Sequence, residues 1–372
     1  MKKLQKIYHQ TNAIIIAHGH EGEIPTQTIH GILKLSTLFN IVALIDKHKV
    51  GQDTSEIYPW ATKKVPIYAN VREAMVHSPK VAILIDDPLK TPGLTTCIRN
   101  GMDIINSSIY YLKDISKLVK LAKKQKTNLF DLRKERTVWK NKLGKIAKIK
   151  AKVVFVTSTD HVLGNHTVAL ELANEAKRRG IKAAFAATGP TGLMLGCDAG
   201  IVFERLRTNF SSHAVEKLIT QLNYERFELI FLEGQASLLH HYASTVVTLL
   251  HASNPHAIVL MHDPSRKYLL GYTDTEFFQV LPLQRNIDII ESMYLEGGTK
   301  YKVVAVSTWG EDNAEQVKKM TNLPVANGFK EDGPGIIMDA VLQHLKDTYK
   351  WIPSNQKSTD MPMVITSEAA TQ

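Results

Sequence analysis

Residues 153–177 follow the order of a β-strand, a polar loop and an α-helix. Residues 153–156 are apolar and mostly β-branched, and residues 168–177 carry apolar side chains at helical spacing. Such a loop binds phosphate through backbone N–H groups and the N-terminus of the following helix, and its glycines let the anion approach. Gly164 is present, but Asn165 stands where the GK[ST] pattern has lysine. We therefore expect the backbone of a phosphate-binding loop without the charge of its lysine.

Length and composition favour a soluble protein with two domains. The chain has 372 residues, enough for two domains that each bury a core. It contains no run of 18 apolar residues and no signal-peptide pattern at its start, so we expect a cytoplasmic protein that does not contact membranes. Cys97 and Cys197 lack the spacing of a metal site, which predicts ordinary thiols, with no disulfide framework and no bound metal.

The net charge of +10 comes from one part of the chain. Residues 113–152 hold fifteen Lys and Arg but only three Asp and Glu. Few aromatic residues are interleaved with these charges, and no nucleic-acid-binding motif accompanies them. We interpret the segment as a solvated helix and linker, which makes a nucleic-acid partner unlikely on sequence grounds, with another anionic partner as the alternative.

Strand-like and helix-like runs alternate over the first 130 residues, as in a parallel α/β sheet. Strands are predicted at residues 12–17, 41–46, 65–68, 81–86 and 103–106, and helices at residues 28–39 and 115–126. Asp46 occupies the place of a ribose-binding acid, but only Gly19 and Gly22 stand in the preceding loop, so the glycine fingerprint for NAD is incomplete. We predict a Rossmann-like domain over residues 1–132 and disfavour NAD binding.

A basic linker is predicted at residues 133–150, followed by a second α/β domain with a parallel sheet at residues 151–350. Its strands are expected at residues 153–156, 183–187, 229–232, 257–261 and 303–307, and its helices at residues 168–179, 213–222, 246–251 and 335–349. Residues 351–372 are polar and are expected to be disordered. The oligomeric state cannot be derived from the sequence, although domains of this class often form homo-oligomers.

Glu233 ends a strongly apolar strand of the second domain. In a parallel sheet the carboxyl ends of the strands face the ligand crevice, so Glu233 should point toward the same edge as the loop at residues 159–167. Its carboxylate could hold Mg²⁺ or act as a general base. Alternatively, it could only accept hydrogen bonds from a neighbouring turn.

Other candidate residues follow neighbouring strands. Residues 188–192, with Gly189 and Gly192, are predicted to form a second glycine-bearing turn at this edge. His240 and His262 are candidate acid–base groups because imidazole titrates near neutral pH. Arg266 follows His262 closely and is a candidate clamp for a carboxylate or phosphate.

Together these blocks resemble a two-domain P-loop family that includes bacterial D-glutamate N-acetyltransferase and has a second domain like dethiobiotin synthetase. The resemblance covers residues 12–345. It rests on Thr159, Asp160, Gly164 and Thr167 in the loop, on residues 187–192, on residues 233–238 with His240, on residues 249–253 with Pro255, on residues 262–266, and on residues 131–133 at the end of the first domain. This resemblance implies a Rossmann-like domain followed by a P-loop NTPase-like domain.

The chain departs from the family pattern at several positions. Ser158 and Asn165 replace the glycine and the lysine of the loop, while Pro190, Asn209 and His241 replace a glutamine, an aspartate and a proline. Glu204 keeps an acid where the family has aspartate. The residues around Glu233 are thus kept while the loop has changed, and this argues most against nucleotide hydrolysis, which needs the lysine charge.

The resemblance implies transfer of an acetyl group from acetyl-CoA to an amino acid such as D-glutamate. Glu233, His240 and His262 would be catalytic. Acetyl-CoA would be bound by Thr159, Asp160, Gly164, Asn165, Thr167, Gly189 and Gly192, and the amino acid by Gln235, Ser237, Arg266 and Glu204. Two alternatives remain. One is an ATP-dependent ligase or kinase using ATP and Mg²⁺, against which Asn165 argues, and the other is a non-catalytic binding protein.

Overall fold

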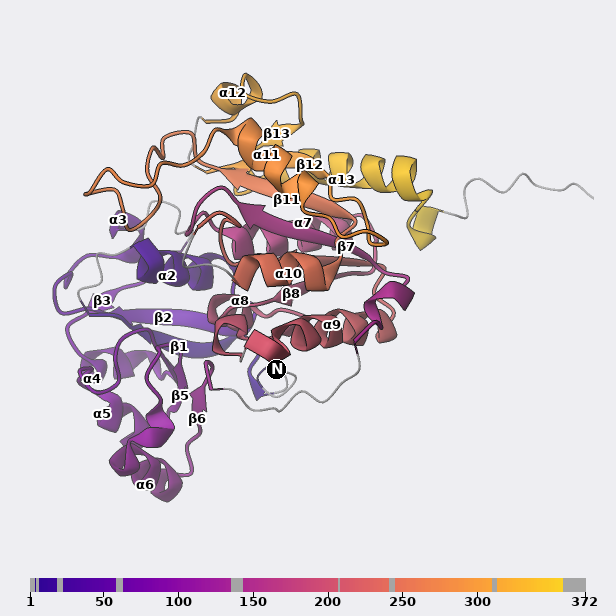
Figure 1. Ribbon diagram of the computed structural model, residues 1–372. Coiled ribbons are helices and arrows are strands. Elements are labelled where there is room, and N and C mark those ends of the chain that lie inside the picture. The colour runs from indigo at the N-terminus through magenta and orange to yellow at the C-terminus, as the bar shows by residue number, and fades with distance from the viewer. Residues whose placement is uncertain are drawn as a thin grey trace, which may run out of the picture.

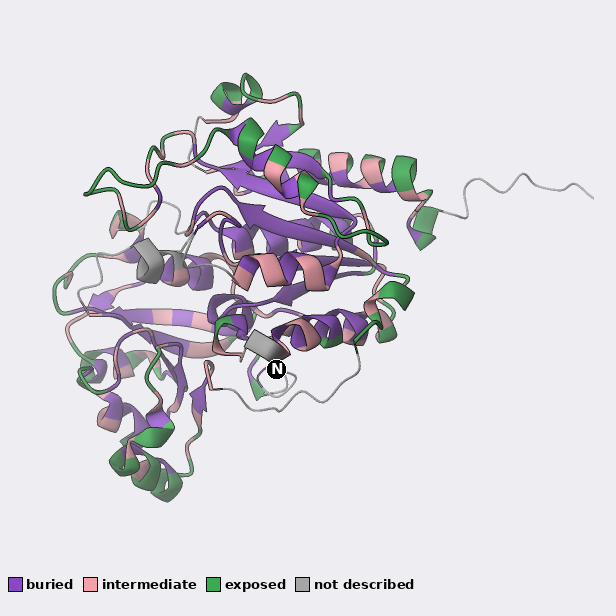
Figure 2. Cartoon of the chain, viewed as in Figure 1, coloured by how far each residue is buried: buried purple, intermediate pink, exposed green. Residues whose placement is uncertain are grey.

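The protein contains two parallel β-sheets, each with helices packed on it (Figure 1). The structure is a computed structural model that describes residues 4, 7–18, 23–57, 63–134, 143–206, 208–240, 245–309 and 313–356, without the side chains of residues 23–27 and 208–209. Most of the glycine-bearing loop predicted after the first strand, part of the predicted linker and most of the predicted tail lie outside these residues. Figure 2 shows that strands of both sheets are largely buried.

The first sheet has six strands in the order β3-β2-β1-β4-β5-β6, all parallel. Their bounds are β1 Thr11–Ile16, β2 Phe39–Ile45, β3 Ile67–Tyr68, β4 Val81–Leu84, β5 Asp103–Asn106 and β6 Leu129–Asp131. The strand order reverses between β1 and β4, as in Rossmann folds. The predicted Rossmann-like domain is therefore confirmed.

The helices of this domain are α2 Glu23–Leu35, α3 Thr54–Ile57, α4 Val71–Ala74, α5 Leu94–Arg99 and α6 Ser116–Gln125, with 3₁₀ turns η1 Met75–His77 and η2 Leu112–Asp114. The predicted helix at residues 28–39 was wrong at its end. Its last residue, Phe39, is the first residue of β2 and is almost fully buried. The Phe39 N–H donates to Ser36 Oγ at 3.2 Å, which closes a turn after α2.

The second sheet has seven parallel strands in the order β13-β12-β11-β7-β10-β8-β9. Their bounds are β7 Lys152–Ser158, β8 Ala183–Ala187, β9 Ala199–Gly200, β10 Leu229–Glu233, β11 Ala257–His262, β12 Val303–Thr308 and β13 Val325–Ala326. The central strands β7, β10 and β11 are buried on both faces, which explains why their sequences are continuous apolar runs rather than alternating ones.

Helices cover both faces of the second sheet. They are α7 Asn165–Arg178, α8 Pro190–Leu195, α9 Thr208–Tyr224, α10 Thr245–Ser253, α11 Leu283–Ser292, α12 Asn313–Lys318 and α13 Gly333–Tyr349, with 3₁₀ turns η3 Ile146–Lys148, η4 Phe203–Arg205 and η5 Ser354–Gln356. Helices α7 and α13 pack in one hydrophobic core, and α9 and α10 pack in another. No helix among the described residues is long and apolar enough to span a membrane.

The prediction of a turn at residues 188–192 was only half right. Gly189 is the N-cap of α8, and Pro190 begins that helix. Proline suits the first helical position, because its ring fixes φ and its missing N–H would have no partner within the helix. The predicted turn is therefore the start of a buried helix that continues to Leu195.

Helix α2 of the first domain packs against α8 of the second. Ser36 Oγ donates to the Met194 carbonyl at 2.8 Å, and the Thr37 N–H donates to the Leu195 carbonyl at 3.2 Å. One hydrophobic core continues across this contact and includes Ile32 of α2. The two domains are thus held together at α8, and these hydrogen bonds lie at the end of that helix.

Candidate functional site

A small cavity of about 120 Å³ lies at the carboxyl edge of the second sheet. It is lined by Thr28, Arg133, His161, Val162, Leu163, Gly164, Asn165, His166, Gly189, Pro190, Thr191, Glu204, Glu233, Gly234 and Gln235. Six residues selected from the sequence therefore meet here: Gly164, Asn165, Gly189, Glu204, Glu233 and Gln235. Both domains contribute, because Thr28 belongs to the first one and Arg133 follows its last strand, β6.

A larger cavity of about 760 Å³ opens elsewhere, next to His256 and Lys302. These residues directly precede β11 and β12, so this cavity lies at the amino ends of the strands. Open parallel sheets bind their ligands at the carboxyl ends. None of the sequence-selected site residues lines the larger cavity, and we therefore place the candidate site in the smaller one.

Glu233 is buried at the end of β10 and lines the small cavity. Its Oε2 accepts hydrogen bonds from the N–H groups of Thr188 at 2.8 Å and Gly189 at 3.3 Å. Burial raises the pKa of Glu233 to about 7, although the two backbone hydrogen bonds act in the opposite direction. The carboxyl group therefore holds the turn before α8, and it also titrates in the range that a general base needs.

Glycines allow the backbone to pack closely around Glu233 and the loop. Gly164 has φ +81°, and a Cβ there would lie 2.6 Å from Cζ of Phe329. A Cβ on Gly192 would lie 2.7 Å from Glu233 Oε2. Gly164 is the N-cap of α7, whose first N–H groups have no partners within the helix and form a suitable place for an anion.

Asn165 is the first residue of α7 and is almost completely buried. Its Nδ2 donates to the Gly234 carbonyl at 2.9 Å and to Ser158 Oγ at 3.2 Å. These bonds join the loop to the turn that follows Glu233. The Oδ1 atom of Asn165 is buried and accepts no hydrogen bond from the residues that the structure describes.

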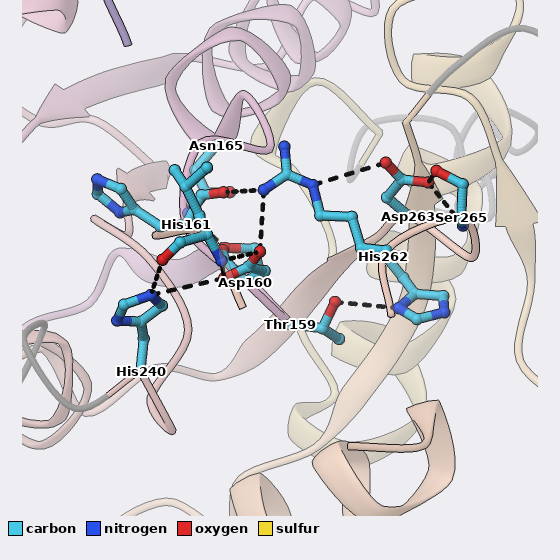
Figure 3. A network of polar contacts seen from close by, with 11 residues as sticks. Thr159, Asp160, His161, Asn165, His240, His262, Asp263 and Ser265 are labelled. Atoms are coloured by element: carbon cyan, nitrogen blue, oxygen red, sulfur yellow. Dashed lines mark hydrogen bonds and ion pairs between the residues drawn. The ribbon is translucent and has the colours of Figure 1, made fainter. Parts of the chain in front are cut away.

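Asp160, a buried member of the polar network in Figure 3, forms an ion pair with Arg266. Arg266 Nη1 lies 2.9 Å from Asp160 Oδ2 and also donates to the His161 carbonyl at 2.9 Å. The Leu270 N–H donates to the same carboxylate at 3.0 Å. Arg266 therefore does not line the cavity, where the predicted substrate clamp would have to lie. It pairs with Asp160 instead, because a carboxylate buried as deeply as Asp160 requires a cationic partner.

The histidines selected from the sequence do not line the cavity. His240 Nε2 lies 3.1 Å from the Leu270 carbonyl oxygen and 3.8 Å from Asp160 Oδ1. His262 is the last residue of β11, and its Nδ1 lies 3.0 Å from Thr159 Oγ1. Figure 3 shows both imidazoles in the network around Asp160. The geometry gives both histidines positions that support the loop.

The other sequence-selected residues also lie outside the cavity lining. The Thr167 N–H donates to the Gly164 carbonyl at 2.9 Å within the first turn of α7. Ser237 Oγ accepts a hydrogen bond from the Leu239 N–H at 3.1 Å. Thr167 and Ser237 are both buried, and these hydrogen bonds are local ones that shape the backbone of the site.

Sequence reasoning did not select His161, His166 or Arg133 as site residues, although all three line the cavity. The two histidines lie within the recognised loop and at the start of α7, so the loop pattern itself was the available signal. Arg133 follows β6, ion-pairs with Glu204, and donates from Nε to the Ser107 carbonyl at 2.6 Å. In the sequence, Arg133 stood out only as part of the motif at residues 131–133. That motif marked the end of the first domain but did not show that this end lies at the cavity.

Buried histidines predict strong loss of stability in acid. Burial lowers the pKa of His161, His166 and His262 to about 4 and that of His256 to about 3. The unfolded chain, in which histidine titrates near 6.5, then binds more protons than the folded one as the pH falls from 6.5 toward 4. Glu233, whose pKa is raised, opposes this by one proton at most.

We expect the free energy of unfolding to fall by roughly 3 kcal/mol per pH unit below pH 6.5, equivalent to about two net protons. Urea denaturation at pH 7.0, 6.0 and 5.5 measures this slope. A midpoint that does not change over this range would contradict the neutral state of these histidines in the folded protein.

Among the described residues, no group of three His, Cys, Asp or Glu side chains is arranged to hold a metal ion. Cys97 and Cys197 are both buried free thiols. The groups that meet at the cavity are thus a carboxyl group, two neutral imidazoles, two side-chain amides, an Arg–Glu ion pair and the N-terminus of α7. Such a set can hold an anion at one end and accept a proton at the other.

Two curated relatives and one solved structure resemble the chain. A D-glutamate N-acetyltransferase from a Pseudoalteromonas species is 32% identical over 187 residues, which cover 50% of this chain and 55% of that protein. A D-glutamate N-acetyltransferase from Tritonibacter scottomollicae is 27% identical over 257 residues, which cover 67% of this chain and 74% of that protein. The chain thus spans only about half the length of the first relative.

The crystal structure of a DUF1611 family protein from Anabaena variabilis superposes with a TM-score of 0.80 at 26% identity, covering 90% of this chain and 99% of that one. A family model described as the P-loop domain of the domain of unknown function DUF1611 matches residues 140–338. A second model, described as its Rossmann-like N-terminal domain, matches residues 47–135. The chain, with its two parallel sheets, its loop at residues 159–167 and Glu233, therefore belongs to the DUF1611 family.

Proposed function

We propose that this protein transfers an acetyl group from acetyl-CoA to the amine of an acidic amino acid, with D-glutamate as the first substrate to test. The observation that carries the proposal is the position of Glu233, a carboxyl group with a pKa of about 7, in a cavity next to the N-terminus of α7. The name of the two curated relatives, D-glutamate N-acetyltransferase, supports the choice of reaction.

Glu233 is the group best placed to move a proton in this reaction. The neutral amine attacks the thioester carbonyl carbon, a C–N bond forms and the C–S bond breaks. Glu233 accepts the proton that leaves the nitrogen and delivers a proton to the departing thiolate, so the carboxylate is regenerated. A base with a pKa near the working pH suits both transfers. The backbone hydrogen bonds from Thr188 and Gly189 hold the carboxylate in place for them.

The loop at residues 159–167 suits the pyrophosphate of acetyl-CoA better than the γ-phosphate of ATP. Gly164 and the N-terminus of the 14-residue helix α7 offer backbone N–H groups and the positive end of the helix dipole. Transfer of a γ-phosphate also needs a lysine and a metal, and Asn165 occupies the position of that lysine. The cavity of about 120 Å³ is smaller than the 300–1,000 Å³ of typical ligand sites, so it would hold only the reacting groups.

Arg133 would bind a carboxylate of the amino acid. It lines the cavity from the first domain, and its ion pair with Glu204 and its bond to Ser107 leave further N–H donors on the guanidinium group. Arginine suits this role because its planar group can bind a carboxylate through two parallel hydrogen bonds. We assign this role to Arg133 in place of Arg266, which pairs with Asp160.

The test is release of free thiol from acetyl-CoA in the presence of D-glutamate, L-glutamate, D-aspartate and simple amines. We expect release that depends on the amine and is fastest with an acidic amino acid. Calorimetric titration with acetyl-CoA and with ATP plus Mg²⁺ accompanies the assay. Binding of ATP but not acetyl-CoA would favour a ligase or kinase instead, and no thiol release with any amine would refute acetyl transfer.

A further inference from the structure

We propose that the carbonyl oxygen of Asn165 is an acceptor for the substrate's amine, so that the position of the usual lysine has become part of an amine-binding subsite. This inference rests on the function proposed above and adds a residue that determines specificity. In a phosphate-binding loop the lysine attracts an anion. Asn165 instead offers an unpaired acceptor, and both Asn165 and Glu233 line the small cavity.

The hydrogen bonds of Asn165 fix which way its amide points. Nδ2 donates to two acceptors, the Gly234 carbonyl and Ser158 Oγ, so the NH₂ group faces the backbone. The reverse orientation would bring Oδ1 against the Gly234 carbonyl, where two acceptors repel each other. Oδ1 is therefore held on the other side of the amide, and Asn165 is one of the residues that line the cavity.

Oδ1 is a buried acceptor without a hydrogen-bond donor among the described residues. Buried carbonyl groups are nearly always paired, and one that is left unpaired in a cavity lining is suited to receive a ligand N–H. Only 5% of the surface of Asn165 is accessible, and Oδ1 itself has almost no accessible surface. In the proposal, the cavity wall therefore shifts slightly so that the ligand N–H can reach Oδ1.

The side chains near Oδ1 of Asn165 favour an amine there, whereas the backbone N–H groups at the start of α7 favour an anion. Glu233 contributes a negative charge when ionised, and the Arg133–Glu204 pair is neutral overall. Burial keeps the neighbouring His161 and His166 neutral above pH 6 by lowering the pKa of each to about 4. A cavity with one carboxylate and one amide carbonyl attracts an N–H donor that is neutral or positive.

An N–H donor could come from two sources, the amino acid's amine or an amide group in the arm of acetyl-CoA. Both would satisfy Oδ1 by the same chemistry. The amine is favoured because Glu233, the proposed proton acceptor, lines the same small cavity and must also face the amine. The experiment therefore measures the two ligands separately.

Calorimetry should compare D-glutamate with glutarate, and D-aspartate with succinate, because each pair differs only by the amine. The wild-type protein is expected to bind the amine member at least tenfold more tightly. In Asn165→Leu, which keeps the number of side-chain heavy atoms but removes the acceptor together with the hydrogen bonds to Gly234 and Ser158, this preference should fall below about threefold. Asn165→Lys, which adds a positive charge, should reverse the preference.

A wild-type protein without preference for either amine would overturn the proposal, and so would a folded Leu variant that keeps the preference. Loss of acetyl-CoA affinity alone in the Leu variant would assign Oδ1 to the arm of acetyl-CoA and would also overturn it. Thermal unfolding of each variant checks the fold. Because ligand binding is measured without turnover, an amine preference in a protein that transfers no acetyl group would contradict only the proposed function.

Discussion

Glu233→Gln is expected to lower kcat/KM for acetyl transfer by about 10²–10⁴-fold, the usual contribution of a general base. The substitution removes the proton acceptor but keeps an oxygen that can accept hydrogen bonds from Thr188 and Gly189. The fold and the affinity for acetyl-CoA should therefore change little. Steady-state kinetics with acetyl-CoA and the best amine measure the loss.

The pH dependence separates this role from a structural one. Because the pKa of Glu233 is raised to about 7, its carboxylate form is lost below that pH, and wild-type kcat/KM should show a step near pH 7 in addition to the rise that comes from the neutral amine. Glu233→Gln should lose this step. Glu233→Ala should also lose the hydrogen bonds to the turn and unfold at a lower temperature. A Gln variant with wild-type activity would show that Glu233 only holds the turn before α8.

The two roles of Glu233 are compatible in the structure. The sequence left open whether this carboxylate acts on a ligand or only accepts hydrogen bonds from a neighbouring turn, and the structure shows the hydrogen bonds from the turn. The turn places Oε2 against backbone N–H groups at the start of α8, while the residue still lines the cavity. Fixing a base by local hydrogen bonds prepares it for proton transfer without further ordering.

Long buried elements of this fold could be predicted because their signal is local. The strands at residues 103–106 and 183–187 were predicted with the observed bounds. The second is a continuous apolar run, which marks a strand buried on both faces, whereas the first has two isoleucines between an aspartate and an asparagine. The strands β6, β9 and β13 were missed. They have only two or three residues each and are defined by pairing with a neighbouring strand, which a single segment of sequence does not reveal.

The part of the site that follows from strand order could be predicted from the sequence. A strand-end acid and a loop after a parallel strand must share an edge, and Glu233 and Asn165 do line one cavity. The partners of long side chains were not predictable. Arg266 is 106 residues from Asp160 in the chain, and only the folded structure shows that the two form a buried pair. The contact between His262 and Thr159 is likewise visible only in the folded structure.

The first domain contributes directly to the candidate site. Its sequence gave no reason to choose between substrate binding, completion of the cleft and assembly. The structure shows that Thr28 and Arg133 line the cavity, and that Thr28 Oγ1 lies 3.1 Å from Thr191 Oγ1 of α8. The first domain therefore closes one side of the cavity formed by the second.

Arg133→Met is expected to raise KM for an acidic amino acid by roughly 30- to 100-fold, or about 2–3 kcal/mol, which is the low end for loss of a partly buried charge contact. Arg133 is 19% exposed, and this accounts for the choice of the low end. KM for acetyl-CoA should change by less than about threefold. Arg133→Lys should recover only part of the loss, because an ammonium group cannot form two parallel hydrogen bonds with a carboxylate.

Arg205 provides the matched control, because it also joins the domains but does not line the cavity. Its guanidinium group donates to the Tyr111 hydroxyl and lies 5.3 Å from the centre of that ring. Arg205→Met should weaken the domain contact without raising KM for the amino acid. If both Met variants raised KM equally, the effect would come from domain placement, and carboxylate binding by Arg133 would be refuted. A rise in KM confined to Arg133→Met, and greater for glutamate than for an amine without a side-chain carboxylate, would instead locate recognition of the acidic group at the end of the first domain.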